Sequence, residues 1–167
     1  SSTLVLSATN WQAGVPVTVT AVDDDFADGA QTCVLYIESA SDDPNYDELD
    51  PDDVTVTVQD DDTAGIVVEP IELEVSEPDS TATFTVRLSS QPRAKVTVDL
   101  TVENGECAVL SSTVTLSDTN WGRGVTVTVM AMDDDVPDGP QFCTVVTHPP
   151  ISEDPGYDGP DRDPEDI

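Results

Sequence analysis

Apolar and polar residues alternate along much of the chain, with valine on one face of each run and threonine on the other. This period of two is typical of a strand in a sheet that buries one face. Valine and threonine are β-branched and suit a pleated surface. Glycine, proline, aspartate and asparagine separate the runs and favour turns. The pattern predicts strands in and around residues 15–21, 54–58, 82–88, 96–102 and 125–131, and no amphipathic helix.

The chain also contains an internal repeat. Residues 2–33 and 112–143 align at an offset of 110, and 20 of the 32 aligned positions carry the same residue. Two short motifs then recur in the same order, DDPNYD with EDPGYD, and DPDDV with DPEDI. A repeat of about 110 residues is the size of an immunoglobulin-like sandwich.

The repeat predicts an all-β protein of immunoglobulin-like antiparallel β-sandwiches in tandem, cut out of frame at both ends. Residues 1–62 match the C-terminal part of one repeat, and residues 63–167 match a second repeat that lacks its last strand. One interpretation is a window on a longer repeat chain. The other is a filament subunit that assembles head-to-tail, its missing strand supplied by the next copy. Trp11 and Trp121 occupy equivalent positions before a strand, where we expect core or edge packing.

The strongly negative net charge of the chain limits the kinds of molecule that it can bind. The 167 residues include 35 acidic and 5 basic ones, which gives a formal net charge of -30. Nucleic acid is excluded as a natural partner because its phosphates would be repelled. No apolar run reaches the roughly 18 residues of a membrane span. A strongly acidic chain with regular strands indicates either solvation in salt water or the binding of cations.

The three cysteines point to one disulfide. Cys33 and Cys143 share a repeat position, whereas Cys107 precedes the repeated segment. The simplest account pairs Cys107 with Cys143 and leaves Cys33 without a partner, or with one in a neighbouring polypeptide. The alternative is three buried free thiols. A disulfide would imply an oxidising, extracellular or cell-surface location.

Three aspartate triplets each follow a Val/Thr strand directly: Asp23–Asp25, Asp60–Asp62 and Asp133–Asp135. Calcium takes six to eight oxygen ligands at about 2.3–2.6 Å, so carboxylates from several loops suit it. Magnesium keeps more of its waters, and zinc is disfavoured in a chain with one histidine. Adjacent carboxylates repel, so a cation would stiffen these turns. The alternative is that the triplets are solvated acidic turns.

Four features together resemble the Calx-β domain family. They are the junction VTVTVQDDDTAGI, the strand-and-turn pair VTVMAMDDDVPDG and VTVTAVDDDFADG, the opening LEVSEPDSTATFTVRLS, and the repeat length. The resemblance covers most of the chain. It implies a seven-stranded sandwich that holds calcium at one end with its acidic loops.

The family's ligand positions, carried onto this chain, give two partial calcium sites. Aspartate followed by glycine stands where the family often has glutamate, and VENGECAVL replaces a further ligand segment, so weaker calcium binding is expected in places. The first set is Asp23, Asp24, Asp28, Asp60, Asp61 and Asp62, and the second is Glu77, Asp133, Asp134 and Asp138.

No catalytic constellation is present in the sequence. The one histidine lies among prolines in VVTHPPIS, and no glycine-rich phosphate cradle occurs, so we expect no enzyme activity. Serine, threonine and proline in THPPIS give only a weak signal for carbohydrate. The sequence predicts a structural or adhesive extracellular module whose partners are adjacent repeats or other copies, with calcium rigidifying the junctions. The alternative is a calcium-sensing or ligand-binding module.

Overall fold

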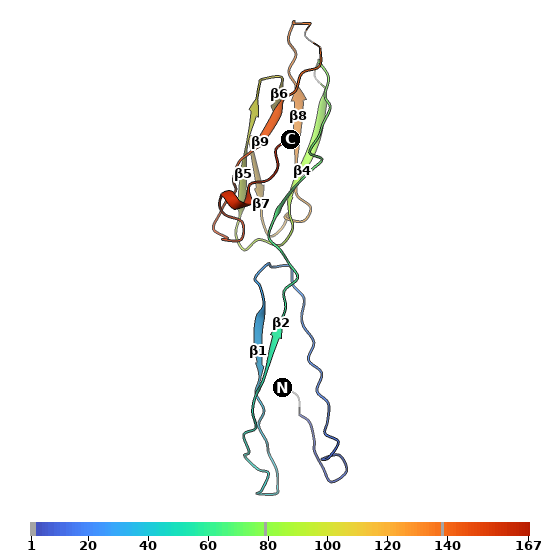
Figure 1. Ribbon diagram of the computed structural model, residues 1–167, viewed down its shortest axis with the longest axis vertical. Helices are drawn as coiled ribbons and strands as arrows, with labels where there is room; N and C mark the ends of the chain where they lie inside the picture. The colour runs from blue at the N-terminus through green and yellow to red at the C-terminus, as the bar shows by residue number, and fades with distance from the viewer. Residues whose placement is uncertain (1–2, 79, 138) are drawn as a thin grey trace.

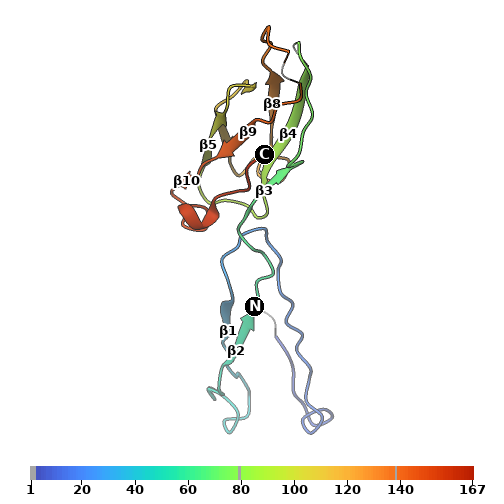
Figure 2. The ribbon, with the colours of Figure 1, turned by 45° about the horizontal axis from the view of Figure 1, so that its top comes forward.

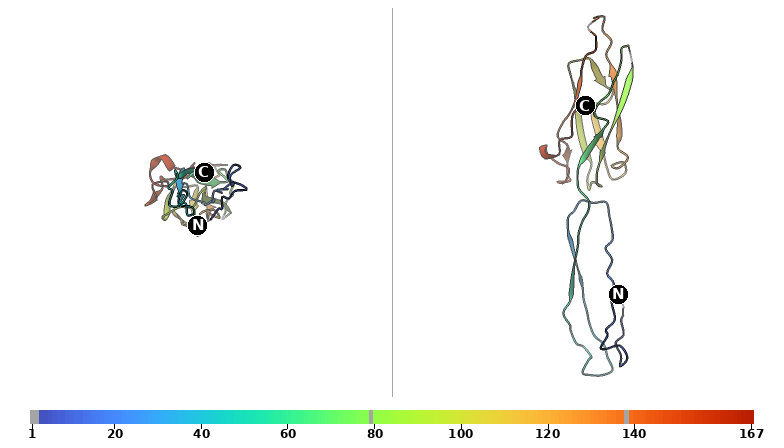
Figure 3. Two further views of the ribbon diagram at one scale, coloured as in Figure 1. Left: turned by 90° about the horizontal axis from the view of Figure 1, so that it is seen from below. Right: turned by 45° about the vertical axis from the view of Figure 1, so that its right-hand side comes forward.

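The computed structural model describes residues 3–78, 80–137 and 139–167 and shows an elongated molecule with two parts joined end to end (Figure 1). Residues 63–167 form the upper part in that view, and residues 3–62 form the lower part. Figure 2 and the right-hand view of Figure 3 show the same arrangement, with the chain passing from one part to the other after strand β2. Among the described residues, no helix is long and apolar enough to cross a membrane.

The upper part is built from antiparallel sheets. One has the strand order β3-β4-β8-β6, and another has the order β10-β5-β7, with β9 also pairing with β5. The described residues form only one helical element, the short 3-10 turn η1 (Pro160–Arg162). The predicted all-β antiparallel fold is therefore confirmed. The strands are β3 (Ile66–Glu69), β4 (Thr81–Leu88), β5 (Val96–Glu103), β6 (Cys107–Val109), β7 (Thr113–Leu116), β8 (Val125–Ala131), β9 (Thr144–Thr147) and β10 (Ile151–Ser152).

Alternation along these strands produces the core. The burial of β4 rises and falls with every second residue, so that Phe84, Val86 and Leu88 are buried between the sheets. Val98 of β5 and Val127 of β8 are buried in the same cluster. Burying one such aliphatic side chain contributes about 1.5–3 kcal/mol. The core holds the upper part together and fixes the loops at both of its ends.

The lower part has the same kind of sequence but no comparable core. Its described residues form one sheet, in which β1 (Gln31–Leu35) pairs antiparallel with β2 (Val54–Val58). The strand predicted at residues 15–21 does not form, and its valines are exposed. A strand needs neighbours to satisfy its backbone groups. The equivalent strand β8 lies between β4 and β6, and residues 3–62 contain no counterpart of either.

The turns of the two parts nevertheless share their local structure. Ser7 N–H donates to Asn10 Oδ1 at 2.6 Å, and the equivalent Ser117 N–H donates to Asn120 Oδ1 at 2.7 Å. The asparagine amide then donates to a backbone carbonyl five residues earlier in both copies. These hydrogen bonds are local, so they form whether or not a core lies beneath them. Trp121, next in the second turn, packs against the core, whereas Trp11 is exposed.

Candidate functional site

The aspartates Asp60, Asp61 and Asp62 lie where the two parts meet, directly after β2 and shortly before β3. One carboxylate oxygen from each lies within 4.8 Å of the others. Asp60 and Asp62 are half-buried, and Asp61 is exposed. Within the described part of the chain, this is the only group of three or more acidic, histidine or cysteine residues with metal-binding spacing. We call it the junction triplet.

Backbone hydrogen bonds fix Asp60 within the triplet. Its carboxylate accepts from Asp62 N–H at 2.9 Å and from Gly29 N–H at 2.5 Å. The pKa of Asp60 is lowered, first by the bond from Asp62 and then by the bond from Gly29. Because Gly29 belongs to the loop that follows the Asp23–Asp25 triplet, this contact joins two acidic segments that lie far apart in the sequence.

Asp62 is the member of the junction triplet whose ionised form is disfavoured. Its pKa is raised, first by loss of hydration and then by the charges of Asp60 and Asp61, with smaller contributions from Asp25 and Asp23. The hydrogen bond from Gly29 to Asp60 places the loop that follows Asp23–Asp25 beside the junction triplet. Of the first predicted set, the structure brings Asp60, Asp61 and Asp62 to metal-binding spacing, and Asp23, Asp24 and Asp28 are not members of that group. The environment favours a positive charge beside Asp62.

Asp28 already has a cationic partner at the junction. Its carboxylate accepts a hydrogen bond from Arg93 at 2.5 Å, and the Arg93 guanidinium also lies 5.3 Å from the centre of the Phe26 ring. Gln91 N–H donates to Asp25 O at 2.7 Å beside this pair. Asp24, another predicted ligand, accepts from Phe26 N–H at 3.0 Å. Sequence reasoning missed Arg93, because nothing in its neighbourhood marks it as an interface residue.

Arg93 also connects the junction to the C-terminal loop of the upper part. Its backbone N–H donates to Asp154 Oδ2 at 2.7 Å. Nearby, the buried Tyr157 hydroxyl donates to Ser90 O at 2.7 Å. Arg162 reaches the same region and donates to Ala64 O at 3.0 Å. These contacts order the end of the upper sandwich against which the lower part rests.

The described members of the second predicted ligand set, Glu77, Asp133 and Asp134, lie at the opposite end of the upper part. Ala131 N–H donates to Ser80 O at 3.1 Å, which places the loop containing Glu77 beside the end of β8, where Asp133 and Asp134 follow. The described members of this set do not form a group with metal-binding spacing. Asp138 lies outside the described residues.

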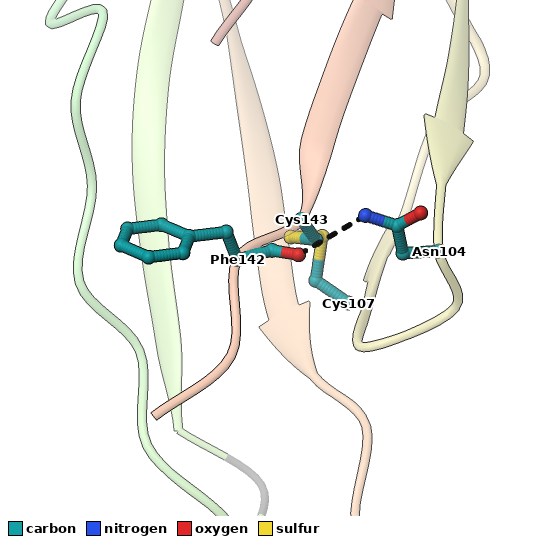
Figure 4. The surroundings of a disulfide bond; sticks show 4 residues. All are labelled: Asn104, Cys107, Phe142 and Cys143. Carbon is teal, nitrogen blue, oxygen red and sulfur yellow. Dashed lines mark hydrogen bonds between the residues drawn. A yellow bond between two sulfur atoms is a disulfide. The ribbon is translucent and has the colours of Figure 1, made fainter. Parts of the chain in front are cut away.

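The expected disulfide joins Cys107 of β6 to Cys143, with their Cα atoms 6.0 Å apart (Figure 4). Asn104 Nδ2 donates to Phe142 O at 3.3 Å beside it. Cys33, at the repeat position of Cys143, is exposed and free. The prediction that Cys107 pairs with Cys143 is therefore confirmed, and three buried free thiols are ruled out.

Comparisons with protein-family models, curated proteins and solved structures find no match to this chain. The resemblance to the Calx-β family therefore stays a prediction.

The junction triplet suits a hard divalent cation. Its donors are all carboxylate oxygens, and Asp23 and Asp25 add negative charge beside them. Calcium is bound through six to eight oxygens, including bidentate carboxylates, backbone carbonyls and water, and it tolerates irregular geometry. Asp28 would have to release Arg93 before it joined such a shell. Asp60, Asp61 and Asp62 are thus the residues that would hold calcium.

Proposed function

We propose that this chain is a structural segment of an extracellular tandem-repeat protein, in which Calx-β-like sandwiches are linked end to end and calcium stiffens the junction. The observation that carries the proposal is the junction triplet, whose three carboxylates lie within 4.8 Å of one another where the two parts meet and to which Gly29 of the neighbouring acidic loop is hydrogen-bonded. A divalent cation there would neutralise repelling carboxylates from two loops and hold them together. The disulfide supports the extracellular location, because disulfides persist in oxidising compartments.

Strand exchange between copies is not part of this proposal. β2 pairs with β1 of the same chain along all five residues, from Gln31 opposite Val58 to Leu35 opposite Val54. In the upper part, Val145 and Ile167 exchange two backbone hydrogen bonds, at 2.6 and 3.0 Å, and so begin the equivalent pairing. Pairing within each repeat therefore accounts for these strands without a second molecule.

Calcium titration by calorimetry, combined with small-angle scattering in calcium and in chelator, tests the proposal. We expect weak binding, with a dissociation constant of about 0.1–1 mM as in extracellular modules, and a stiffer elongated particle in calcium. Micromolar or tighter binding with a large change of shape would instead support the sensing module. No heat and no change in scattering would leave the triplets as solvated turns and overturn the calcium proposal.

Charge-matched variants locate the binding. The triple variant Asp60→Asn, Asp61→Asn, Asp62→Asn should abolish the calcium effect on scattering. A control with the same change in net charge replaces three exposed aspartates of the lower part, Asp42, Asp50 and Asp52, by asparagine. Equal loss of binding in both variants would show that calcium responds to overall charge and not to the junction.

A further inference from the structure

The loop between β5 and β6 contains an asparagine followed by a glycine. Asn104 and Gly105 are both exposed, and their φ angles are positive, 78° and 85°. Beyond the two chain neighbours of Gly105, no atom of the described residues lies within 4 Å of where a Cβ on it would be. Because glycine has no Cβ to shield its backbone nitrogen, that nitrogen is open to the side chain of the preceding residue.

The other three asparagines of the chain lack this arrangement. Asn10 and Asn120 are each followed by tryptophan, and Asn45 is followed by tyrosine. Asn10 Oδ1 and Asn120 Oδ1 each accept a hydrogen bond from a serine N–H, and Asn45 Nδ2 donates to an aspartate carboxylate. A bulky following residue and a fixed amide both hinder attack on the side-chain carbonyl. Asn104 is thus the asparagine whose side chain is most open to attack by the backbone.

The Asn104 amide also connects the two segments that the disulfide joins. Its Nδ2 donates to Phe142 O at 3.3 Å, beside the bond between Cys107 and Cys143 (Figure 4). The loop between β5 and β6 is therefore held to the chain that leads into β9 by one covalent link and by this hydrogen bond. A chemical change at Asn104 would alter the second link and leave the first in place.

We propose that Asn104 is a modification site, at which the side-chain amide is converted to a carboxylate by a reaction that needs only water. The Gly105 nitrogen attacks Asn104 Cγ, so that a bond between these two atoms forms and the Cγ–Nδ2 bond breaks. The proton of Gly105 N–H leaves with the amide nitrogen as ammonia. Water then opens the cyclic imide at either of its carbonyls and leaves aspartate or isoaspartate at position 104.

The product of this reaction reverses the contact that Asn104 makes. A carboxylate has no N–H to donate, so it faces the Phe142 carbonyl as a second acceptor and the hydrogen bond is lost. The new negative charge also lies between Glu103 and Glu106, and like charges at short range repel. Isoaspartate further lengthens the main chain, because the peptide bond then runs through the former side chain. The reaction therefore loosens the loop while the disulfide keeps the two segments joined.

Peptide mapping by mass spectrometry, after the folded and disulfide-bonded chain has aged in mildly alkaline buffer, tests the proposal. We expect conversion at Asn104 to be at least about tenfold faster than at any of the other three asparagines. The same chain, reduced and unfolded in urea, is the control that shows the converted peptides to be detectable. Conversion at Asn104 that is no faster than at the other asparagines, or that is confined to the unfolded chain, would overturn the proposal.

Hydrogen exchange at Met132 measures the effect on the loop, because Met132 N–H donates to Glu106 O at 3.0 Å. Asn104→Asp should accelerate this exchange about two- to fivefold, and the aged wild type should approach the same rate. Asn104→Ala removes the hydrogen bond without adding charge, so its acceleration should be smaller. Asn45→Asp adds the same charge in the lower part and should leave Met132 unchanged. Equal exchange at Met132 in Asn104→Asp and in fresh wild type would contradict the loosening.

Discussion

Arg93 is the residue at which three kinds of contact meet. Its guanidinium forms an ion pair with Asp28 and lies over the Phe26 ring. Its backbone N–H donates a hydrogen bond to Asp154. Its side chain is 57% exposed, so solvent screens the ion pair and its contribution is small. Arg93 lies between the C-terminal loop of the upper part and the loops of the lower part, and it therefore links the two parts.

We expect Arg93→Ala to loosen the junction and leave the upper core intact. The lost ion pair and ring contact should cost about 0.5–1 kcal/mol. Hydrogen exchange at Gln91, whose N–H bonds to Asp25 O, should then accelerate about two- to fivefold. Arg87→Ala is the control, because the Arg87 pair with Glu69, at 3.5 Å, lies within the upper part. Equal acceleration in both variants would contradict a junction role.

Asp62 predicts a pH effect with a definite sign. Its pKa is raised above 3.8 by loss of hydration and by neighbouring carboxylates, so its ionised form costs junction stability at neutral pH. That cost falls as the pH drops through the raised pKa, and it is absent below 3.8. In chelator at pH 7, Asp62→Asn should therefore slow hydrogen exchange at Gly29, which bonds to Asp60. Below pH 3.8 the variant and the wild type should exchange alike.

The control for this experiment is Asp118→Asn, which removes one exposed charge from the upper part. Calcium should slow exchange at Gly29 in the wild type and in the control, and much less in Asp62→Asn. Faster exchange at Gly29 in chelated Asp62→Asn than in wild type would mean that the Asp62 carboxylate supports the junction without any cation.

At the scale of elements, equivalent strands differ in what they contribute. Val127→Ala removes a methyl pair from the closed core and should cost about 2 kcal/mol of unfolding free energy in urea. Val17→Ala is the same change at the equivalent exposed position, and it should stay within about 0.5 kcal/mol. A cost at Val17 as large as that at Val127 would show that the lower part has a core which the structure lacks.

Alternation predicted the strands that find a partner in the chain, including β2, which pairs with β1 alone. β5 has strand partners, and its alternating Val96, Val98 and Leu100 are buried in the core, as their spacing indicated. The same pattern failed at residues 15–21, since alternation reports a face that is able to be buried and carries no information on whether a partner is present. The Arg93 contacts lay beyond reach for a related reason, because they join residues 65 positions apart through loop geometry.

The candidate site was predictable only in part. The aspartate run after the strand at residues 54–58 marked the junction triplet, whose three carboxylates lie within 4.8 Å of one another. Glu77, Asp133 and Asp134 had equally suitable residue types, yet the described loops at that end do not bring them to metal-binding spacing. Spacing along a chain does not fix how two separate loops orient their side chains.

At the scale of the whole molecule, the two parts share a sequence pattern and turns, but only the upper part forms a closed core. The upper part has two sheets, a core and a disulfide, whereas the lower part has one hairpin and turns that repeat those of the upper part. The net charge of the whole chain, -30, spreads over an extended shape, which lowers self-repulsion compared with a compact one (Figure 3). This arrangement suits an array in which each repeat contributes length.

The route of the main chain from β2 to β3 sets how such an array would bear load. Only residues 59–65 separate these two strands, and they include the junction triplet. Seven residues offer at most about 25 Å when fully drawn out, so the connection holds little slack. Tension applied along the long axis would pass from hairpin to sandwich through the main chain of these seven residues, and a cation held by the three neighbouring carboxylates would resist their extension.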